Sequence, residues 1–293
     1  MKTIEFSRTA SALARLYQGT DNSFPHRARA AIEYFGEKDW LSIGPEDIQS
    51  YRAHLAMRPK MRYIQGKGSV PTKDFLTIPT INKFIAAFGS LCLLAHSRGI
   101  LPASYVNPAK LIKRPRENNA RIVHICREDI ERLIDMATLS RNPKLAAFIA
   151  VAASCGARLG NLQRLTWGDV DLNTGTVRLD VTKNGTTLTT AISPRAIKEL
   201  KRICKNQHQP SDLIFGKQKP MRAFRTAVEM AGLSNRLTRI HDLRACAASI
   251  AIQAGCPTLS VQKLLGHKTE SMTRRYANLD HRAVLSAVSA TWS

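Results

Sequence analysis

Near the C-terminal end of the chain, residue types that can bind and transform a phosphate group lie close together. The stretch from residue 236 to 278 contains His241, Arg244, His267 and Tyr276. A guanidinium group binds phosphate oxygens through a planar fork of donors and keeps its charge. An imidazole can accept or donate a proton near neutral pH. The stretch is therefore either an active site for phosphate chemistry or an ordinary basic helical surface.

The motif H-x-x-R is weak evidence by itself. It occurs three times, at His26/Arg29, His124/Arg127 and His241/Arg244. The last copy differs in its context, because residues 241–252 open with a polar turn and continue as an Ala-rich apolar helix. His241 and Arg244 then share one face at a helix N-terminus, where the helix dipole favours phosphate.

The neighbouring elements present the remaining residues. A helix is predicted to end at Gly266, because glycine is the usual residue of a left-handed helix cap, and His267 follows directly. Tyr276 comes nine residues after His267, on another short predicted helix. Residues 174–193 contrast with their surroundings, because β-branched residues alternate there around the turn sequence "KNG". This pattern predicts a β-hairpin.

The net charge favours a large anionic partner. The chain has 44 Lys and Arg against 22 Asp and Glu, a net charge of +22. Divided at residue 120, the two halves carry +9 and +13, so the excess is not confined to a tail. Nucleic acid fits this distribution better than a small acidic metabolite does. A basic surface kept for solubility is the alternative.

The first half of the chain is predicted to be helical. Residues 26–36, 44–57 and 80–100 carry apolar residues at three- and four-residue spacing. Residues 58–73 contain no acid and form a basic loop or hairpin that can follow a phosphate backbone, or else a solvated loop. The candidate DNA-binding residues there are Arg58, Lys60, Arg62, Lys67 and Lys73.

Proline breakers and charged residues after position 101 mark a linker. The sequence predicts a helical domain at residues 1–112, a linker at 113–124 and a second domain with a C-terminal tail at 125–293. Residues 142–157 are apolar on most faces, which indicates a central core helix in the second domain.

Together these features resemble the tyrosine recombinases of the lambda integrase and Xer type. The matching positions, in the family's order, are Arg158 in "CGARLG", Lys183 in "VTKNGTT", His241 and Arg244 in "HDLR", His267 in "LLGH" and Tyr276 in "RRYAN". The similarity extends over most of residues 20 to 285. It implies a mainly α fold, with an all-helical, SAM-like core-binding domain and a mixed α+β catalytic domain that holds a small antiparallel sheet.

The resemblance also implies a reaction. Tyr276 would attack a DNA phosphodiester, leaving a 3′-phosphotyrosine and a free 5′-hydroxyl. A phenol has a pKa of about 10 and needs help to lose its proton, for which His241 is the expected base. Arg158 and Arg244 would stabilise the charge that develops on the phosphate.

Two further residues complete the expected site. Lys183 would protonate the leaving 5′-oxygen, and His267 would donate to a non-bridging oxygen. The sequence has no cluster of Asp and Glu suited to two magnesium ions, so we expect no metal, and neither a cofactor nor ATP.

Some features depart from the family pattern or extend it. Asn161 stands where relatives commonly have an acidic residue, which predicts an altered rate or geometry without loss of the chemistry. The region before residue 20 is short for the arm-site-binding domain of some phage integrases. The tail at residues 279–293 has apolar residues at helical spacing. The tail either packs on its own subunit or docks on a neighbouring one. Docking on a neighbour predicts that the protein is a monomer when free and a homotetramer on two DNA duplexes.

The predicted function is therefore a site-specific DNA recombinase, first of all an integrase of a phage or other mobile element. A Xer-like resolvase of chromosome or plasmid dimers is the next reading. A non-catalytic DNA-binding protein on a recombinase scaffold and a type IB topoisomerase are the others. The chain shows neither a signal peptide nor a run of eighteen apolar residues, so a cytoplasmic location is expected.

Overall fold

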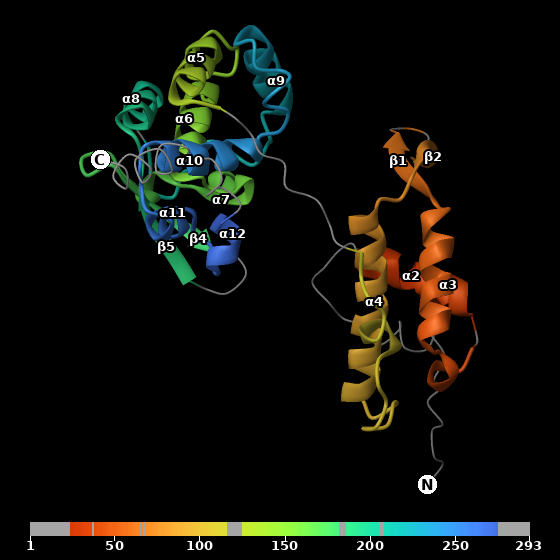
Figure 1. The fold of residues 1–293 in the computed structure, drawn as a ribbon. Helices are drawn as coiled ribbons and strands as arrows, with labels where there is room; N and C mark the ends of the chain where they lie inside the picture. The colour runs from red at the N-terminus through yellow and green to blue at the C-terminus, as the bar shows by residue number, and fades with distance from the viewer. Residues whose placement is uncertain are drawn as a thin grey trace, which may run out of the picture. The chain divides into compact units, whose positions relative to one another are not determined.

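The computed structural model describes residues 24–36, 38–64, 66, 68–115, 125–181, 186–204 and 208–274. The chain divides into two compact units, residues 1–119 and 120–293 (Figure 1). Each unit has a hydrophobic core of its own. The predicted linker at 113–124 stays a prediction, because residues 116–124 lie outside the described part of the chain.

The N-terminal unit is built from helices. Its helical elements are α2 (Phe24–Phe35), η1 (Trp40–Ser42), α3 (Pro45–Ala56), α4 (Ile78–Ser97) and η2 (Pro108–Lys110). Pro45 stands at the first position of α3, where its missing N–H is not needed, and Asp47 accepts a hydrogen bond from the Gly44 N–H at 2.9 Å. Residues within and next to the first turn thus cap the N-terminus of α3.

The core of this unit forms along α4. Trp40 is fully buried, stacks on Phe88 with ring centroids 4.8 Å apart, and its indole N–H donates to the Cys92 sulfur at 3.2 Å. α4 is long and apolar enough to span a membrane by length and composition, but it packs against α2 and α3 and lines the core. α4 is therefore a core helix of this unit.

Between α3 and α4 the chain forms a hairpin, one of the forms that the basic sequence of residues 58–73 left open. Strand β1 (Pro59–Ile64) pairs antiparallel with β2 (Gly68–Phe75), with a register shift between Pro59 and Met61. Gly66 and Gly68 have φ values of +84° and +73°, which only glycine adopts without strain, so the turn depends on both of them.

The C-terminal unit surrounds one apolar helix. Its elements are α5 (Arg127–Thr138), α6 (Leu145–Cys155), α7 (Leu159–Arg164), η3 (Trp167–Asp169), β3 (Val170–Asp171), β4 (Thr176–Val181), β5 (Thr186–Ala191), α8 (Pro194–Ile203), α9 (Met221–Met230), α10 (Asp242–Gln253), α11 (Thr258–Leu265) and α12 (Glu270–Arg274). Ten of the 11 residues of α6 are buried, and this helix packs against α5, α8 and α10. It is the central core helix that the sequence predicts.

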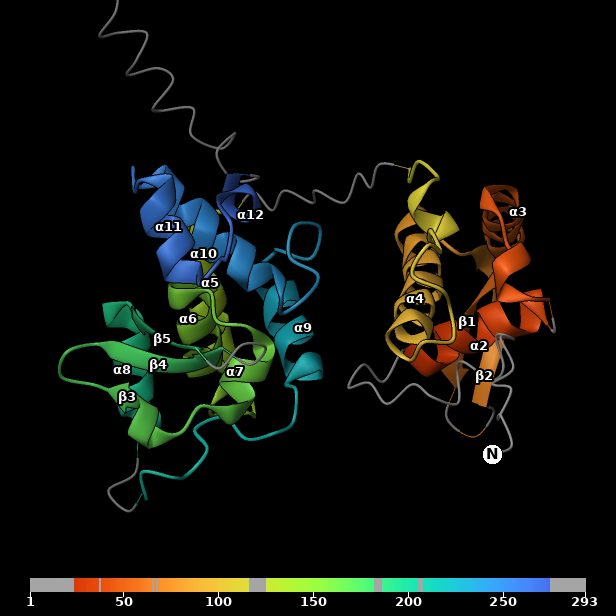
Figure 2. The ribbon, with the colours of Figure 1, turned by 90° about the horizontal axis from the view of Figure 1, so that it is seen from below.

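The sheet of this unit is small and antiparallel, with the order β3-β4-β5 (Figure 2). Val177 and Leu179 of β4 are buried in the core, whereas Arg178 between them is exposed. This alternation is typical of a sheet with one face on the core. The predicted mainly α fold with a small antiparallel sheet is confirmed. The N-terminal unit is not all-helical as predicted, because it also contains the β1–β2 hairpin.

Helix α6 ends where three segments meet. Its C-cap, Gly156, has φ +62°, and a Cβ atom built there would lie 2.3 Å from the Leu265 Cδ2 atom and 3.4 Å from the Ala247 Cβ atom. Leu265 is buried, so its side chain has little room to move aside. This position therefore requires glycine both for its backbone conformation and for the space around it.

Gly156→Ala is expected to lower the free energy of unfolding by about 2–4 kcal/mol, from backbone strain plus overpacking. The matched control is Gly255→Ala, because Gly255 also has a positive φ (+81°) but no atom within 4 Å of the added methyl group. Gly255→Ala should lower the free energy of unfolding by the backbone strain alone, about 1 kcal/mol. Urea unfolding followed by circular dichroism measures the free energy of unfolding of both variants. Equal losses in the two variants would show that the Leu265 side chain moves aside without destabilising the unit.

Candidate active site

Arg244 joins the ends of two helices in the C-terminal unit. The residue is buried on α10, with 7% of its surface exposed. Its Nη1 donates to the Gly156 carbonyl at 2.6 Å and its Nη2 to the Leu265 carbonyl at 2.7 Å. Helix C-terminal carbonyls carry partial negative charge, so both bonds are charge-assisted. The Arg244 fork thereby fixes the segments that lead to Arg158 and to His267.

Arg158 lies two residues after Gly156, at the N-cap of α7. Its carbonyl accepts from the N–H groups of Asn161 and Leu162 at 2.8 and 3.2 Å, which begins the helix. The Arg158 side chain is partly exposed, and its guanidinium forms no hydrogen bond or ion pair with any residue that the structure describes. Its donors are therefore available to an anion from solution.

His241 stands at the N-cap of α10, as the sequence predicts. The Asp242 carboxylate accepts from the backbone N–H groups of Thr238 and Arg239 at 3.2 and 3.0 Å. These two bonds hold the turn that leads into the helix, because they satisfy donors that the helix itself does not use. Asp242 thereby fixes the backbone at His241.

The charges around His241 favour its neutral form. Partial desolvation lowers the pKa of His241 below its ordinary value of 6.5. The positive charges of Arg244 and Arg158 lower the pKa further, whereas Asp242 acts in the opposite direction. The imidazole is therefore able to accept a proton at neutral pH. Arg244 follows His241 by three residues on α10, and its bond to the Gly156 carbonyl brings the segment of Arg158 to the same part of the unit.

A buried carboxylate supports this region from α5. Asp129 receives a two-bond fork from Arg236, at 2.7 and 3.0 Å, and a third bond from Arg132 at 2.6 Å. Burial raises the pKa of Asp129, but the hydrogen bond from Arg236 and its other partners outweigh this and hold the pKa below its usual range. The Arg132 Nε also donates to the Ala231 carbonyl at 3.0 Å. The loop before His241 is thus tied to α5 at its start, Ala231, and near its middle, Arg236.

His267 follows the C-cap Gly266 of α11, which has φ +61°. Its Nδ1 lies 2.8 Å from the hydroxyl oxygen of Thr273, which is fully buried on α12. Gln262 donates to the His267 carbonyl at 3.1 Å. The bond at Nδ1 sets the direction of the imidazole ring, as hydrogen-bonded partners do for functional histidines.

The sheet lies beside the same segment. A Cβ atom at Gly266 would lie 2.8 Å from the Leu188 Cδ2 atom of β5, so the hairpin of β4 and β5 packs against the glycine before His267. Figure 1 shows α11 beside these two strands, in agreement with this contact. Lys183 and Tyr276 lie outside the described residues, as does Lys67.

Four of the six predicted catalytic residues are thus brought to one region: Arg158, His241, Arg244 and His267. The sequence did not indicate Asp129, Arg236 or Thr273 as supporting residues. Asp129 and Arg236 are 107 residues apart, and no local pattern connects them. Asn161 is buried and accepts from the Arg164 Nη2 at 3.3 Å, so its side chain is part of α7 packing.

The predicted DNA-binding residues belong to the N-terminal unit. Arg58 lies 3.9 Å from the Glu33 carboxylate, and Lys60 lies 3.5 Å from that of Asp74. Such surface pairs contribute little to stability and exchange readily for another anion. Arg62 and Lys73 are also exposed; within the described ranges neither has an acidic partner.

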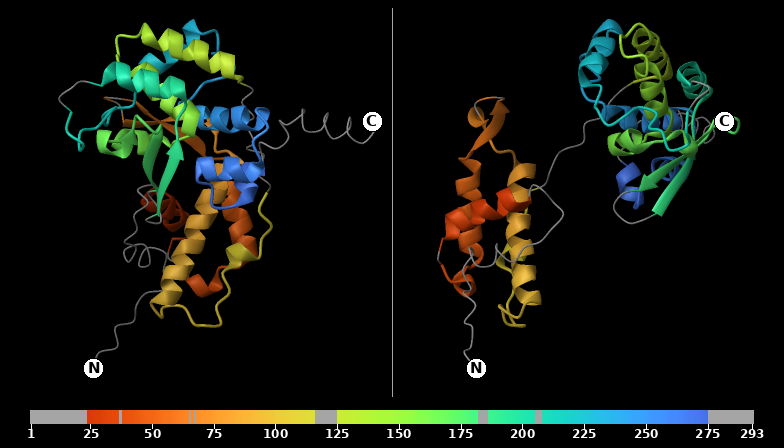
Figure 3. Two further views of the ribbon diagram at one scale, coloured as in Figure 1. Left: turned by 90° about the vertical axis from the view of Figure 1, so that its left-hand side faces the viewer. Right: turned by 180° about the vertical axis from the view of Figure 1, so that it is seen from behind.

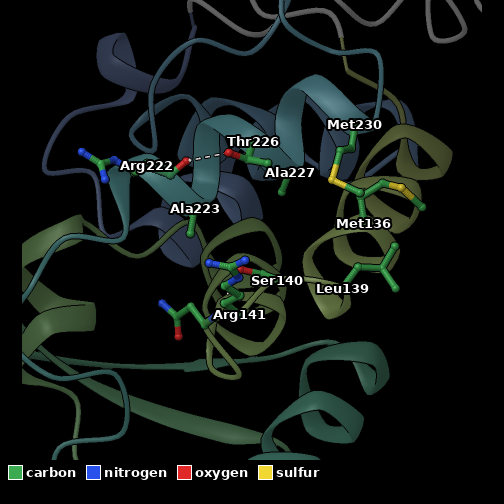
Figure 4. Close-up of a pocket in the computed structure, with 10 residues that line it drawn as sticks. Met136, Leu139, Ser140, Arg141, Arg222, Ala223, Thr226, Ala227 and Met230 are labelled. Atoms are coloured by element: carbon green, nitrogen blue, oxygen red, sulfur yellow. Dashed lines mark hydrogen bonds between the residues drawn. The ribbon is translucent and has the colours of Figure 1, made fainter.

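A pocket of about 590 Å³ between the end of α5 and α9 is separate from these residues. Figure 4 shows Met136 and Met230 close together on its apolar wall, with Arg141 and Arg222 at its edge. None of the residues that line it belongs to the predicted site. Of the predicted site residues that the structure describes, His241 is exposed and Arg158 and His267 are partly exposed, whereas Arg244 is buried.

Two guanidinium groups and two imidazoles gathered from separate segments are able to bind phosphate oxygens and to move a proton. The model of the phage integrase family, described as "Phage integrase family", matches residues 124–282. The chain belongs to this family, and the predicted resemblance to tyrosine recombinases is confirmed.

Several relatives share part of the chain. It is 28% identical to the integrase of Salmonella phage P22 over 192 residues, which cover 59% of this chain and 48% of that protein. It is 25% identical to tyrosine recombinase XerC of Roseiflexus sp. (strain RS-1), over 83% of this chain and 77% of that one. XerC of Haemophilus ducreyi (strain 35000HP / ATCC 700724) is 30% identical over 60% and 61%. The chain thus spans about half to three quarters of these relatives.

Solved structures share the fold at low identity. The structure of a lambda integrase dimer bound to a COC′ core site has a TM-score of 0.65 at 16% identity and covers 93% of both chains. XerH bound to palindromic difH substrate, a post-cleavage complex, has a TM-score of 0.68 at 18% identity, over 93% of this chain and 80% of that one. These likenesses confirm the predicted fold class.

Proposed function

We propose that this protein is a site-specific DNA recombinase that cuts and rejoins duplex DNA through a phosphotyrosine intermediate, without metal or ATP. The observation that carries the proposal is the Arg244 fork. Its bonds to the carbonyls of Gly156 and Leu265 hold together the segments that bear Arg158 and His267. Family membership supports the same activity.

The first step is an in-line attack on phosphorus. The Tyr276 oxygen forms a bond to the phosphorus as the bond to the 5′-oxygen breaks, leaving a 3′-phosphotyrosine. His241 accepts the phenol proton, because its lowered pKa keeps the ring neutral. Arg158 and Arg244 donate to the non-bridging oxygens, where negative charge develops.

The leaving and rejoining steps use the remaining residues. Lys183 donates a proton to the departing 5′-oxygen, and His267 donates to a non-bridging oxygen. The phosphotyrosyl bond has the same ester character as the bond that was cut, so a 5′-hydroxyl of a partner duplex reverses the reaction. Lys183 regains its proton from the attacking 5′-hydroxyl, and the proton on His241 returns to the Tyr276 oxygen. The sum of the two steps is strand exchange without hydrolysis.

The proposed setting is integration or excision of a phage or other mobile element in the cytoplasm, and resolution of chromosome or plasmid dimers is the second candidate. Relatives carry both kinds of name, integrase and XerC. The proposed assembly is a homotetramer on two duplexes, with the tail at residues 279–293 exchanged between subunits. Arg58, Lys60, Arg62, Lys67 and Lys73 are proposed to bind the DNA backbone from the N-terminal unit.

A covalent-trapping assay tests the activity. Nicked, labelled duplexes from the DNA that flanks the gene are mixed with the protein in a metal chelator and separated on a denaturing gel. An adduct that survives detergent and disappears after proteolysis supports the recombinase. Native binding without an adduct would support the non-catalytic DNA-binding protein. Relaxation of a supercoiled plasmid that lacks any trapped site would support the topoisomerase.

The pH dependence of cleavage follows from the environment of His241. Its pKa lies below 6.5 in the free protein, so the base is neutral and active above that pH. The rate at low DNA concentration, which reports the free enzyme, should fall as the pH drops through this lowered pKa and stay level from about pH 7 upward. His241→Gln should be slower by about 10²-fold or more and lose the acid limb. An acid limb that persists unchanged in His241→Gln would assign it to another group.

A further inference from the structure

The β1–β2 hairpin extends beyond the helices of the N-terminal unit (Figures 1 and 3). Residues 61–64 of β1 are all exposed, as are residues 73–75 of β2. The strands pair with each other, while α3 ends and α4 begins at the base of the hairpin. A two-stranded ribbon is only marginally stable alone in water, so this one is placed for contact with a partner.

Two large apolar side chains share one face of the ribbon. Side chains alternate along a strand, and Met61 and Tyr63 are paired with Pro71 and Ser69, so these four lie on the same face. The exposed fractions are 49% for Met61 and 74% for Tyr63. Large apolar side chains gathered on an exposed face indicate a binding surface.

The charges of the ribbon select the kind of partner. The described part of the hairpin and its first flanking residue contain four basic side chains: Arg58, Lys60, Arg62 and Lys73. One acid, Asp74, opposes them in these residues. A positive ribbon with an apolar face complements a groove of duplex DNA, whose walls are phosphates and whose floor is made of base edges. The major groove admits a two-stranded β-ribbon, and apolar side chains there contact thymine methyl groups.

We propose that the hairpin of residues 59–75 is a β-ribbon arm that lies in the major groove, with Met61 and Tyr63 against base edges and Arg62 near a phosphate. This inference rests on the proposed function for its partner, and it goes further by assigning a groove and an apolar contact. The apolar contacts of the arm add affinity that salt does not screen, unlike its phosphate contact through Arg62.

Fluorescence anisotropy with a mixed-sequence duplex tests the arm without knowledge of the recombination site. The variants are Met61→Ala/Tyr63→Ala, Arg62→Ala and, as control, Leu93→Ala, an apolar residue of α4 that is 60% exposed. We expect the double variant to bind about tenfold more weakly with an unchanged salt slope. Arg62→Ala should reduce the slope of log K against log salt by about 0.9, and the control should match wild type.

Replacing thymine by uracil in the same duplex removes the methyl groups alone. Wild type should bind the uracil duplex more weakly than the thymine duplex, and the double variant should bind both equally. Equal affinity of wild type and double variant, or a uracil effect that survives in the double variant, overturns the proposal. A wild-type dimer in solution that the double variant disrupts would assign the face to a second copy instead.

The experiments distinguish an error in the proposed arm from an error in the proposed recombinase activity. Wild-type protein that traps an adduct, with hairpin variants that bind duplex equally well, leaves the recombinase intact and refutes the arm. The reverse pattern, in which the arm variants lose affinity but no adduct forms, refutes the catalytic function alone. Thermal unfolding of each variant establishes that it is folded, and single Ala variants at positions 61 and 63 replace the double variant where it is not.

Discussion

Tyr276→Phe is expected to bind DNA as wild type does and to form no covalent adduct. The substitution removes one oxygen atom, the proposed nucleophile, and keeps the aromatic ring. Loss of the nucleophile from an assembled active site reduces cleavage by at least about 10⁴-fold, since the remaining groups have nothing to activate. The cations that hold the phosphate stay in place, so affinity should change little.

The measurement uses the nicked duplex in a denaturing gel for the adduct and a native gel for binding. Tyr34→Phe, which removes the same oxygen from a residue of the N-terminal unit, is the control and should trap DNA at the wild-type rate. An adduct formed by Tyr276→Phe would place the nucleophile elsewhere. Loss of binding together with the adduct would indicate a folding defect, which thermal unfolding of the variant detects.

Arg244→Lys is expected to reduce the rate of cleavage by about 10²–10³-fold, because a single ammonium group cannot reproduce a fork aimed at phosphate oxygens. It should also destabilise the C-terminal unit. The guanidinium donates to the carbonyls of Gly156 and Leu265, and a hydrogen bond that involves a charged group contributes about 1.5–3 kcal/mol.

Arg158→Lys provides the matched comparison, because the Arg158 guanidinium makes no hydrogen bond or ion pair with the described residues. Arg158→Lys should reduce the rate of cleavage by a similar factor. Its free energy of unfolding should change by less than about 0.5 kcal/mol. Single-turnover cleavage at saturating protein and urea unfolding measure the two effects separately. If Arg244→Lys loses stability yet cleaves at the wild-type rate in the cold, Arg244 is a structural residue and contacts no phosphate.

Short-range features of the site were predictable because their geometry depends on a few neighbouring residues. His241 and Arg244 lie within one turn of a helix start, and Gly266 ends α11 in the left-handed conformation that glycine favours. The mainly α fold and the β4–β5 hairpin were predictable for the same reason, since their periodicities are local. The residue types for phosphate chemistry could also be identified from the sequence, although Lys183 and Tyr276 keep roles that are proposed only.

The hairpin of residues 59–75 was only partly predictable. Its basic composition was compatible with a loop or a ribbon, and the exposed face with Met61 and Tyr63 emerged from the strand register. Register decides which side chains share a face, because a shift by one residue turns every side chain to the other side. The basic residues indicated a DNA contact, but the apolar face needed the pairing.

The sequence by itself determined the chemical groups of this protein and their order along the chain, whereas the tertiary structure decided what holds them. Arg244 binds carbonyls 88 and 21 residues away, and any residue could have supplied such an acceptor, since every backbone unit has one. Asp129 and Arg236 meet only because α5 packs beside the loop before His241. Contacts of this kind depend on how helices pack, and packing is a property of the whole core, which no short stretch of residues specifies.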